Sequence, residues 1–167
     1  MGTAHKLLVE VGGATLVERA VASAVAAGFD DVYLVHGAVV LPAMEGVTFV
    51  ENPRWAEGQA TSLQAGIAAA AGHDAVVVGL GDQPGVAPEA WRLLAAATAT
   101  PIAVATYGGQ RANPVRLAAE VWPLLPGTGD EGARSLLRER PELVTEVPCP
   151  GSGADVDTVE DLGRWSS

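Results

Sequence analysis

The sequence predicts an α/β fold in which helices cover a mostly parallel sheet. Short β-branched runs alternate with longer runs rich in Ala and Leu, as strands and helices do in such folds. The run from Ala75 to Leu80 is apolar without alternation, which indicates a strand buried on both faces of a parallel sheet. The chain has 167 residues, of which 49% are hydrophobic. That is enough for one core, so we expect a single domain over residues 1–167.

Five segments have the composition of strands. They are Val32–Val35, Val47–Val50, Ala75–Leu80, Ile102–Thr106 and Val144–Val147. In addition, the pair Gly108-Gly109 is typical of a tight turn between two short strands, the second of which reaches Val115.

Helices are predicted between these strands from their capping residues and apolar faces. Thr15 and Glu18 form a capping-box pattern, and Gly28 stands where a helix usually ends. The predicted helices are Thr15–Ala27, Ala60–Ala71, Pro88–Ala97, and two more that follow the capping-box pairs Thr128/Glu131 and Thr158/Asp161.

Composition excludes several classes of function. The formal net charge is −10, from 20 acidic and 10 basic residues, whereas nucleic-acid binding draws its affinity from many Lys and Arg side chains. Cys149 is the only cysteine, which rules out an internal disulfide and a Cys-based metal site. No apolar run approaches the roughly 20 residues of a membrane span, and the first residues lack a signal peptide pattern. We expect a cytoplasmic protein that binds neither nucleic acid nor a membrane.

Two acidic stretches have the pattern of a metal site. Asp82 directly follows the strand that is expected to be buried, and ligands of parallel sheets bind beyond the carboxyl ends of strands. Asp155 and Asp157 are two residues apart, so in an extended stretch they point the same way. Together with Asp82 they would complete a carboxylate site for Mg²⁺. Taken separately, they are also explained by an ordinary turn and a solvated acidic loop.

Three further features have weaker signals. The loop around Gly58 opens a helix, and its free backbone N–H groups suit an anionic ligand. Helix capping by Thr61 or Ser62 alone would also explain it. Capping likewise explains the segment 128–134, and a lone lysine such as Lys6 is usually a solvated surface residue.

Taken in order, these motifs resemble the MobA-like nucleotidyltransferases, and within them the molybdenum cofactor cytidylyltransferases. The resemblance extends over nearly the whole chain. The residues that carry it are Lys6-Leu7-Leu8, Asn52-Pro53-x-Trp55-x-x-Gly58-x-x-x-Ser62-Leu63-x-x-Gly66, Gly81-Asp82-Gln83-Pro84, Gly129-Asp130-x-Gly132-Ala133-Arg134 and Asp155-Val156-Asp157-Thr158-x-Glu160-Asp161-Leu162.

The resemblance implies a Rossmann-like three-layer fold of the nucleotide-diphospho-sugar transferase type. It implies Mg²⁺-dependent transfer of a nucleotidyl group from a nucleoside triphosphate to an acceptor phosphate, with release of pyrophosphate. In the cytidylyltransferase branch the nucleotide is CTP and the acceptor is molybdopterin. The implied roles are catalysis by Lys6 and Asp82, metal binding by Asp82 and Asp157, and nucleotide binding by Gly58, Ser62, Leu63 and Gly81.

The chain departs from the family pattern in two places. The family begins with a strand and a loop of the form Leu-Ala-Ala-Gly-x-x-x-Arg-Met-Gly, of which only Met1-Gly2 is matched. We therefore expect the natural protein to start roughly 15–20 residues earlier, and the 167-residue chain to be poorly active. The family segment Gly-Arg-x-Gly-His-Pro is altered at residues 109–114. GTP as the nucleotide, a different phosphorylated acceptor, or a nucleotide-binding protein without catalysis thus remain alternatives.

Overall fold

The computed structural model describes residues 6–165, apart from the side chains of Val159 and Trp165. The Met1-Gly2 match lies outside the described residues. Within them the α-helices and strands follow in the order β1 (Glu10–Val11), β2 (Ala14–Thr15), α2 (Leu16–Ala26), β3 (Tyr33–His36), β4 (Thr48–Glu51), α3 (Gln59–Ala69), β5 (Ala75–Val78), α4 (Pro88–Ala96), β6 (Ile102–Tyr107), β7 (Gln110–Ala118), α5 (Arg134–Glu139), β8 (Val144–Pro148) and α6 (Val159–Trp165).

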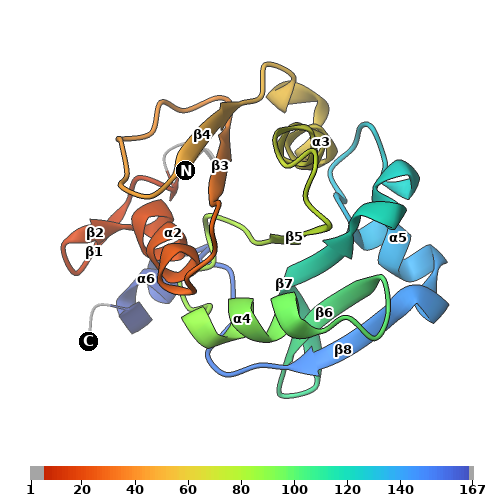
Figure 1. Cartoon of the computed structure of the whole chain (residues 1–167). Coiled ribbons are helices and arrows are strands. Elements are labelled where there is room, and N and C mark those ends of the chain that lie inside the picture. The colour runs from red at the N-terminus through yellow and green to blue at the C-terminus, as the bar shows by residue number, and fades with distance from the viewer. Residues whose placement is uncertain (1–5, 166–167) are drawn as a thin grey trace.

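The main sheet has four strands in the order β5-β7-β6-β8 (Figure 1). Three of them run in the same direction, because β7 is antiparallel to both β5 and β6 while β6 and β8 are parallel. The prediction of a mostly parallel sheet is therefore confirmed for strand direction. Two of the three pairings are nevertheless antiparallel, because β7 returns through a tight turn and inserts between β5 and β6.

Local sequence patterns predicted most boundaries of the helices and strands to within one or two residues of the observed ones. Thr15 and Glu18 form the expected capping box at the start of α2, and Gly28 follows the helix with φ of 85°. Gly108 and Gly109 both have positive φ, 59° and 83°, as the predicted two-residue turn between β6 and β7 requires. The short hairpin β1–β2, which turns at residues 12–13, was not predicted.

The prediction for Ala75–Leu80 holds only in part. β5 spans Ala75–Val78, and its side chains pack on both faces of the sheet, Val76 and Val78 against one core cluster and Val77 against another. They are only half-buried, and β5 pairs with β7 on one edge only. The strand that is almost fully buried on both faces is β6. Its side chains alternate between two core clusters, with Ile102 and Val104 facing one and Ala103 and Ala105 the other.

Helices cover both faces of the main sheet and complete three layers. Leu63 of α3 and Leu136 and Leu137 of α5 pack in the cluster that contains Ile102 and Val104. Leu94 of α4 packs in the cluster on the opposite face. The parallel pair β3–β4 forms a separate two-stranded sheet, in which β3 has a strand on one edge only. Among the described helices, none is long and apolar enough to cross a membrane.

The predicted helix start at Thr128/Glu131 is wrong. Helix α5 begins at Arg134, and its N-cap residue Ala133 makes no capping hydrogen bond with its side chain. The loop before it contains Gly129 and Gly132 with positive φ, 101° and 56°, which a continuous right-handed helix does not accommodate. Glu131 instead pairs with Arg138 on the outside of the helix.

Two adjacent leucines of α4 provide a test of this core. Leu94 is fully buried, whereas Leu93 is 36% exposed. We expect Leu94→Ala to lower the free energy of unfolding by about 2–5 kcal/mol, because it leaves a cavity between α4 and the sheet. Leu93→Ala should change it by only about 0.5 kcal/mol. Urea denaturation followed by circular dichroism measures both, and equal losses would contradict this assignment of the buried face.

Candidate functional site

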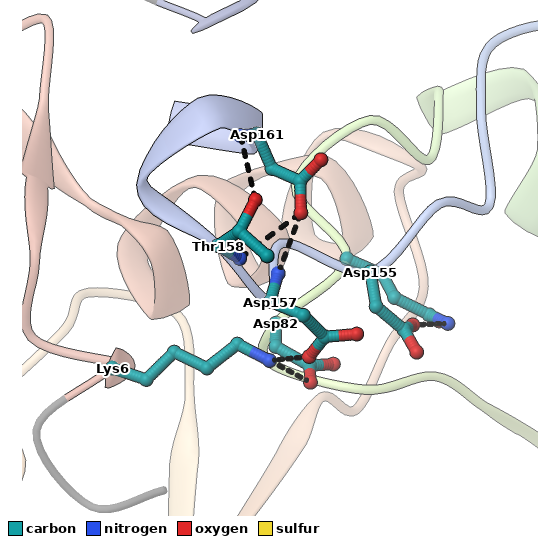
Figure 2. A network of polar contacts seen from close by, with 7 residues as sticks. Lys6, Asp82, Asp155, Asp157, Thr158 and Asp161 are labelled. Carbon is teal, nitrogen blue, oxygen red and sulfur yellow. Dashed lines mark hydrogen bonds and ion pairs between the residues drawn. The ribbon is translucent and has the colours of Figure 1, made fainter. Parts of the chain in front are cut away.

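Three carboxylates converge at the carboxyl end of β5. Asp82 lies in the loop that follows this strand, and Asp155 and Asp157 lie in the extended segment that precedes α6. One oxygen atom of each lies within 4.8 Å of the others. The three side chains come from segments more than 70 residues apart, and Figure 2 shows them side by side. The predicted convergence of Asp82 and Asp157 is present in the structure.

Val156 fixes the direction of the two neighbouring carboxylates. Its side chain is 2% exposed and packs with Val11 and Leu16, and its backbone N–H donates to the Asp82 carbonyl at 3.0 Å. In an extended segment the residues on either side of a buried side chain point away from it together. Asp155 and Asp157 therefore turn to the same side, toward Asp82.

The start of α6 holds the segment from the other end. The Asp161 carboxylate accepts hydrogen bonds from the backbone N–H groups of Asp157 (3.1 Å) and Thr158 (3.0 Å). The Thr158 hydroxyl accepts from the Asp161 N–H at 3.1 Å, so the predicted cap is confirmed (Figure 2). The backbone N–H of Asp157, followed by contacts with Thr158, lowers the pKa of the Asp161 carboxyl. Asp161 is thus a charged anchor for the backbone of Asp157.

Gly81 accommodates the segment that carries Lys6. A Cβ atom at this position would lie 3.3 Å from a methyl group of Leu7 and 3.4 Å from one of Val17. The Leu7 carbonyl in turn accepts from the Val17 N–H at 3.2 Å, which ties the segment to α2. Gly81 therefore has a packing role, since the absence of a side chain lets Lys6 approach the carboxylates.

Lys6 lies between two of the three carboxylates. Its ammonium group donates to Asp82 Oδ2 at 3.0 Å and also to Asp157 Oδ1. The Lys6 side chain is 12% exposed, against 64% for Asp157. Burial by itself would lower the pKa of Lys6, but the hydrogen bonds and charges of Asp157 and Asp82 outweigh it and raise this pKa. Lys6 is therefore ion-paired within the site, unlike a solvated surface lysine.

The chemistry of the cluster fits a hard divalent cation. Asp82 Oδ1 is buried and has no hydrogen-bond partner, although buried polar atoms are almost always paired. Carboxylate oxygens are the ligands that Mg²⁺ and Mn²⁺ prefer. An unpaired buried oxygen beside two further carboxylates is thus available as a metal ligand.

Gln83 is a member of the site that sequence reasoning missed. It is 5% exposed, and its Nε2 donates to Asp155 Oδ1 at 2.5 Å. Its Oε1 is buried and has no partner. A glutamine next to the predicted metal ligand was the available signal, but the contact with Asp155 depends on a residue 72 positions away.

The loop around Gly58 has a different set of neighbours. Gly58 has φ of 109° and lies in contact with the loop that precedes α5, where a Cβ atom would lie 2.3 Å from the Gly129 carbonyl oxygen. The Ala60 N–H donates to that carbonyl at 2.9 Å, and the Gly129 N–H donates to the Glu57 carbonyl at 3.0 Å. The start of α3 is therefore capped by a distant loop, whereas the sequence indicated Thr61 or Ser62.

The hydroxyl groups in the first turn of α3 face Asn52. Its Nδ2 donates to Thr61 Oγ1 and Ser62 Oγ, both at 2.9 Å, and Asn52 is 2% exposed. Leu63 is a core residue, so its side chain is turned away from any ligand at this loop. In the described part of the chain, no hydrogen bond or ion pair joins Gly58, Ser62 or Leu63 to the carboxylate cluster. The predicted residues thus form two groups, one at Asp82 and one at the start of α3.

Comparison with known families identifies the architecture. The family model described as the MobA-like NTP transferase domain matches residues 1–144. Nicotine blue oxidoreductase of Paenarthrobacter nicotinovorans is 34% identical over an aligned stretch of 181 positions, and the match covers 98% of this chain and 89% of that protein. The purine catabolism protein PucB of Bacillus subtilis (strain 168) is 32% identical over 111 residues, which cover 63% of this chain and 54% of PucB.

Solved structures agree with this result. The complex of Rv0371c from Mycobacterium tuberculosis H37Rv with manganese has a TM-score of 0.76 and 30% identity, covering 96% of this chain and 91% of that one. The 2-C-methyl-D-erythritol 4-phosphate cytidylyltransferase from Thermus thermophilus has a TM-score of 0.69 and 19% identity, covering 96% and 91%. The fold is therefore the nucleotide-diphospho-sugar transferase-like α/β fold, as predicted.

The contact at Gly58 can be tested by comparing two glycine-to-alanine substitutions. We expect Gly58→Ala to lower the free energy of unfolding by at least about 1–3 kcal/mol, because the new side chain needs an unfavourable φ and meets the Gly129 carbonyl. Protection of the Ala60 amide from hydrogen exchange should fall with it. Gly127→Ala is the control, because nothing lies within 4 Å of a Cβ atom there. Equal stability of both variants would show that the loop contact contributes nothing.

Proposed function

The chain belongs to the MobA-like NTP transferase family, and on that premise we propose that it transfers CMP from CTP to the phosphate of molybdopterin, with release of pyrophosphate. The observation that carries the transferase chemistry is the convergence of Asp82, Asp155 and Asp157, with the ammonium group of Lys6 bound to two of them. Paired carboxylates and a cation are what a reaction between two phosphate anions needs.

Asp82 and Asp157 are the proposed ligands of Mg²⁺, and Asp155 is close enough to take part. When bound, the ion would supply positive charge that offsets the repulsion between the two anionic substrates. A relative with 30% identity forms a complex with manganese, which supports a divalent cation as the proposed cofactor. A bound divalent cation would also explain how a protein of net charge −10 can bind polyanions.

The chain's own residues position the substrates. An oxygen of the acceptor phosphate attacks the α-phosphorus in line, and the bond from this phosphorus to the bridging oxygen breaks as pyrophosphate leaves with the electron pair. Little covalent help is needed, so alignment and charge stabilisation dominate the rate. The Lys6 ammonium group offers three N–H donors for the negative charge that grows on the leaving pyrophosphate.

The choice of CTP and molybdopterin is supported by the segment Gly58–Leu63, which resembles the cytidylyltransferase branch. GTP, another phosphorylated acceptor, and nucleotide binding without turnover are the alternatives that the altered segment 109–114 keeps open. Pyrophosphate release is measured with each nucleoside triphosphate and Mg²⁺, once with molybdopterin and once with other phosphorylated small molecules, which separates these alternatives. Release from CTP supports the proposal, and nucleotide binding without release supports a homologue that lacks catalysis.

One relative raises a second candidate function. The P. nicotinovorans protein, which is 34% identical over nearly the whole chain, is named as an oxidoreductase. A redox role would transfer electrons from a reduced cofactor to an organic acceptor, and the three carboxylates would have no direct part in it. Oxidation of NADH or NADPH with a quinone-type dye, unaffected by Asp82→Asn, would favour this function over nucleotidyl transfer.

Asp82 is the most direct test of the proposed chemistry. We expect Asp82→Asn to lower kcat/KM for nucleotidyl transfer by about a hundredfold or more, because the variant loses a charged metal ligand. Asp74→Asn is the matched control, since Asp74 is an exposed residue at the opposite end of β5. It should leave the rate unchanged, and circular dichroism should show both variants folded. An Asp82→Asn protein with full activity would contradict the assignment.

Nucleotide choice gives an independent prediction. We expect a higher kcat/KM with CTP than with GTP, because residues 58–63 lack the Gly-Pro-Leu-Ala-Gly sequence that is typical of the guanylyl branch. Competition between the two nucleotides in one reaction, with products separated by chromatography, measures the ratio directly. Equal use of both, or a preference for GTP, would refute this prediction and leave the phosphoryl chemistry untouched.

A further inference from the structure

We propose that Lys6 is an internal counter-ion that occupies the cation site of the free protein and leaves it when a divalent cation binds. Its displacement would release the ammonium group for the triphosphate at the moment when the cation arrives. The inference rests on the proposed function, which makes the three carboxylates the cation site.

The geometry places Lys6 and a metal ion in competition. The ammonium group contacts Asp82 Oδ2 at 3.0 Å and also Asp157 Oδ1, which belong to two of the three carboxylates that converge. A metal ion held by both carboxylates at about 2.0–2.6 Å would take up the space between them that the ammonium group occupies. Both cations cannot lie between these two side chains, so one of them has to move.

The Lys6 side chain can change its conformation, whereas the backbones that carry the carboxylates are held by hydrogen bonds. The backbones of Asp82 and Asp157 are tied by the hydrogen bonds of Val156 and Asp161. The lysine side chain has four rotatable carbon–carbon bonds and is attached to its backbone only at the far end. Within residues 6–165, Lys6 is also the one cationic side chain that forms an ion pair with any of the three clustered carboxylates, namely Asp82 and Asp157. Once Lys6 is displaced, the metal ion is therefore the cation that balances the negative charge of these carboxylates.

Asp82 and Gln83 indicate where additional binding capacity lies. Asp82 Oδ1 is buried without a partner, on the carboxylate whose other oxygen Lys6 contacts. Gln83, which is 5% exposed, donates to Asp155 and leaves its own Oε1 unpaired. Lys6 therefore leaves some oxygen atoms of the site without a hydrogen-bond partner. A cation with several ligand positions can use oxygens that the ammonium group leaves without a partner.

The sequence allows a measurement on the unmodified protein. Lys6 is the only lysine of the chain, so protein grown with ¹³C/¹⁵N-labelled lysine gives one side-chain signal. We expect the ¹³Cε resonance of Lys6 to shift on titration with Mg²⁺ and to saturate at the same concentration as Mg²⁺ binding measured by calorimetry. Saturable Mg²⁺ binding with an unchanged Lys6 signal would overturn the proposal.

Substitution tests the competition from the other direction. Lys6→Met should tighten Mn²⁺ binding, measured by electron paramagnetic resonance without nucleotide, by about tenfold, because the ion no longer displaces a charge-assisted contact. Arg140→Met is the control: it removes the same charge from an exposed pair with Glu142. It should leave the affinity within about twofold. Equal or weaker Mn²⁺ binding by folded Lys6→Met protein would overturn the proposal, and if this variant does not fold, the lysine signal decides.

The two proposals can fail separately. If Mg²⁺ shifts the Lys6 signal but no nucleotidyl transfer occurs with any nucleotide, the counter-ion role stands and the proposed function fails. If transfer occurs and the bound cation leaves the signal unchanged, only the counter-ion role fails. If neither Mg²⁺ nor Mn²⁺ binds, the carboxylates are not a cation site and the counter-ion role is refuted.

Discussion

Mutual repulsion among Asp82, Asp155 and Asp157 is the constraint on which the candidate site depends. Negative charges this close repel one another, and a cation among them offsets the repulsion. Lys6 meets this need, and the surrounding structure keeps the group together. Val156 is buried between two of the acids, and Asp161 holds the backbone beyond them, so hydrophobic packing and a helix cap together offset the electrostatic cost.

The motif around Gly58 shows that a sequence signature can have a structural role beside its proposed ligand contact. Its positive φ and missing side chain let the Gly129 loop approach to hydrogen-bonding distance and cap α3. Asn52, buried beneath the same loop, binds the hydroxyls of Thr61 and Ser62. The shape of the loop is thus set from two sides, and a ligand there would meet a backbone that is already ordered.

The family relationship combines one fold with relatives of different names. The matched family is a nucleotidyltransferase family, while the P. nicotinovorans relative is named as an oxidoreductase. A shared fold does not decide between such activities, because function lies in the site that the fold supports. Here the oxygen-rich cluster with its lysine favours phosphoryl chemistry, since its charges suit an anionic substrate and a divalent cation.

Interactions between near neighbours could be predicted from the sequence by itself. The cap at Thr15, the turn at Gly108-Gly109 and the common direction of Asp155 and Asp157 all arise within a few residues, so their patterns determine the local structure. The resemblance to a family then indicated that Asp82 and Asp157 belong together.

Long-range pairing decided the rest. β7 inserts between β5 and β6, which leaves β5 half-buried despite its apolar run. Lys6 and Gln83 have hydrogen-bond partners 72 to 151 positions away along the chain, and Gly129 bonds to another loop. No spacing rule connects residues at such separations. Their roles depend on how the folded chain brings its segments into contact, because hydrogen bonds and charges act over a few ångströms of space regardless of the distance along the sequence.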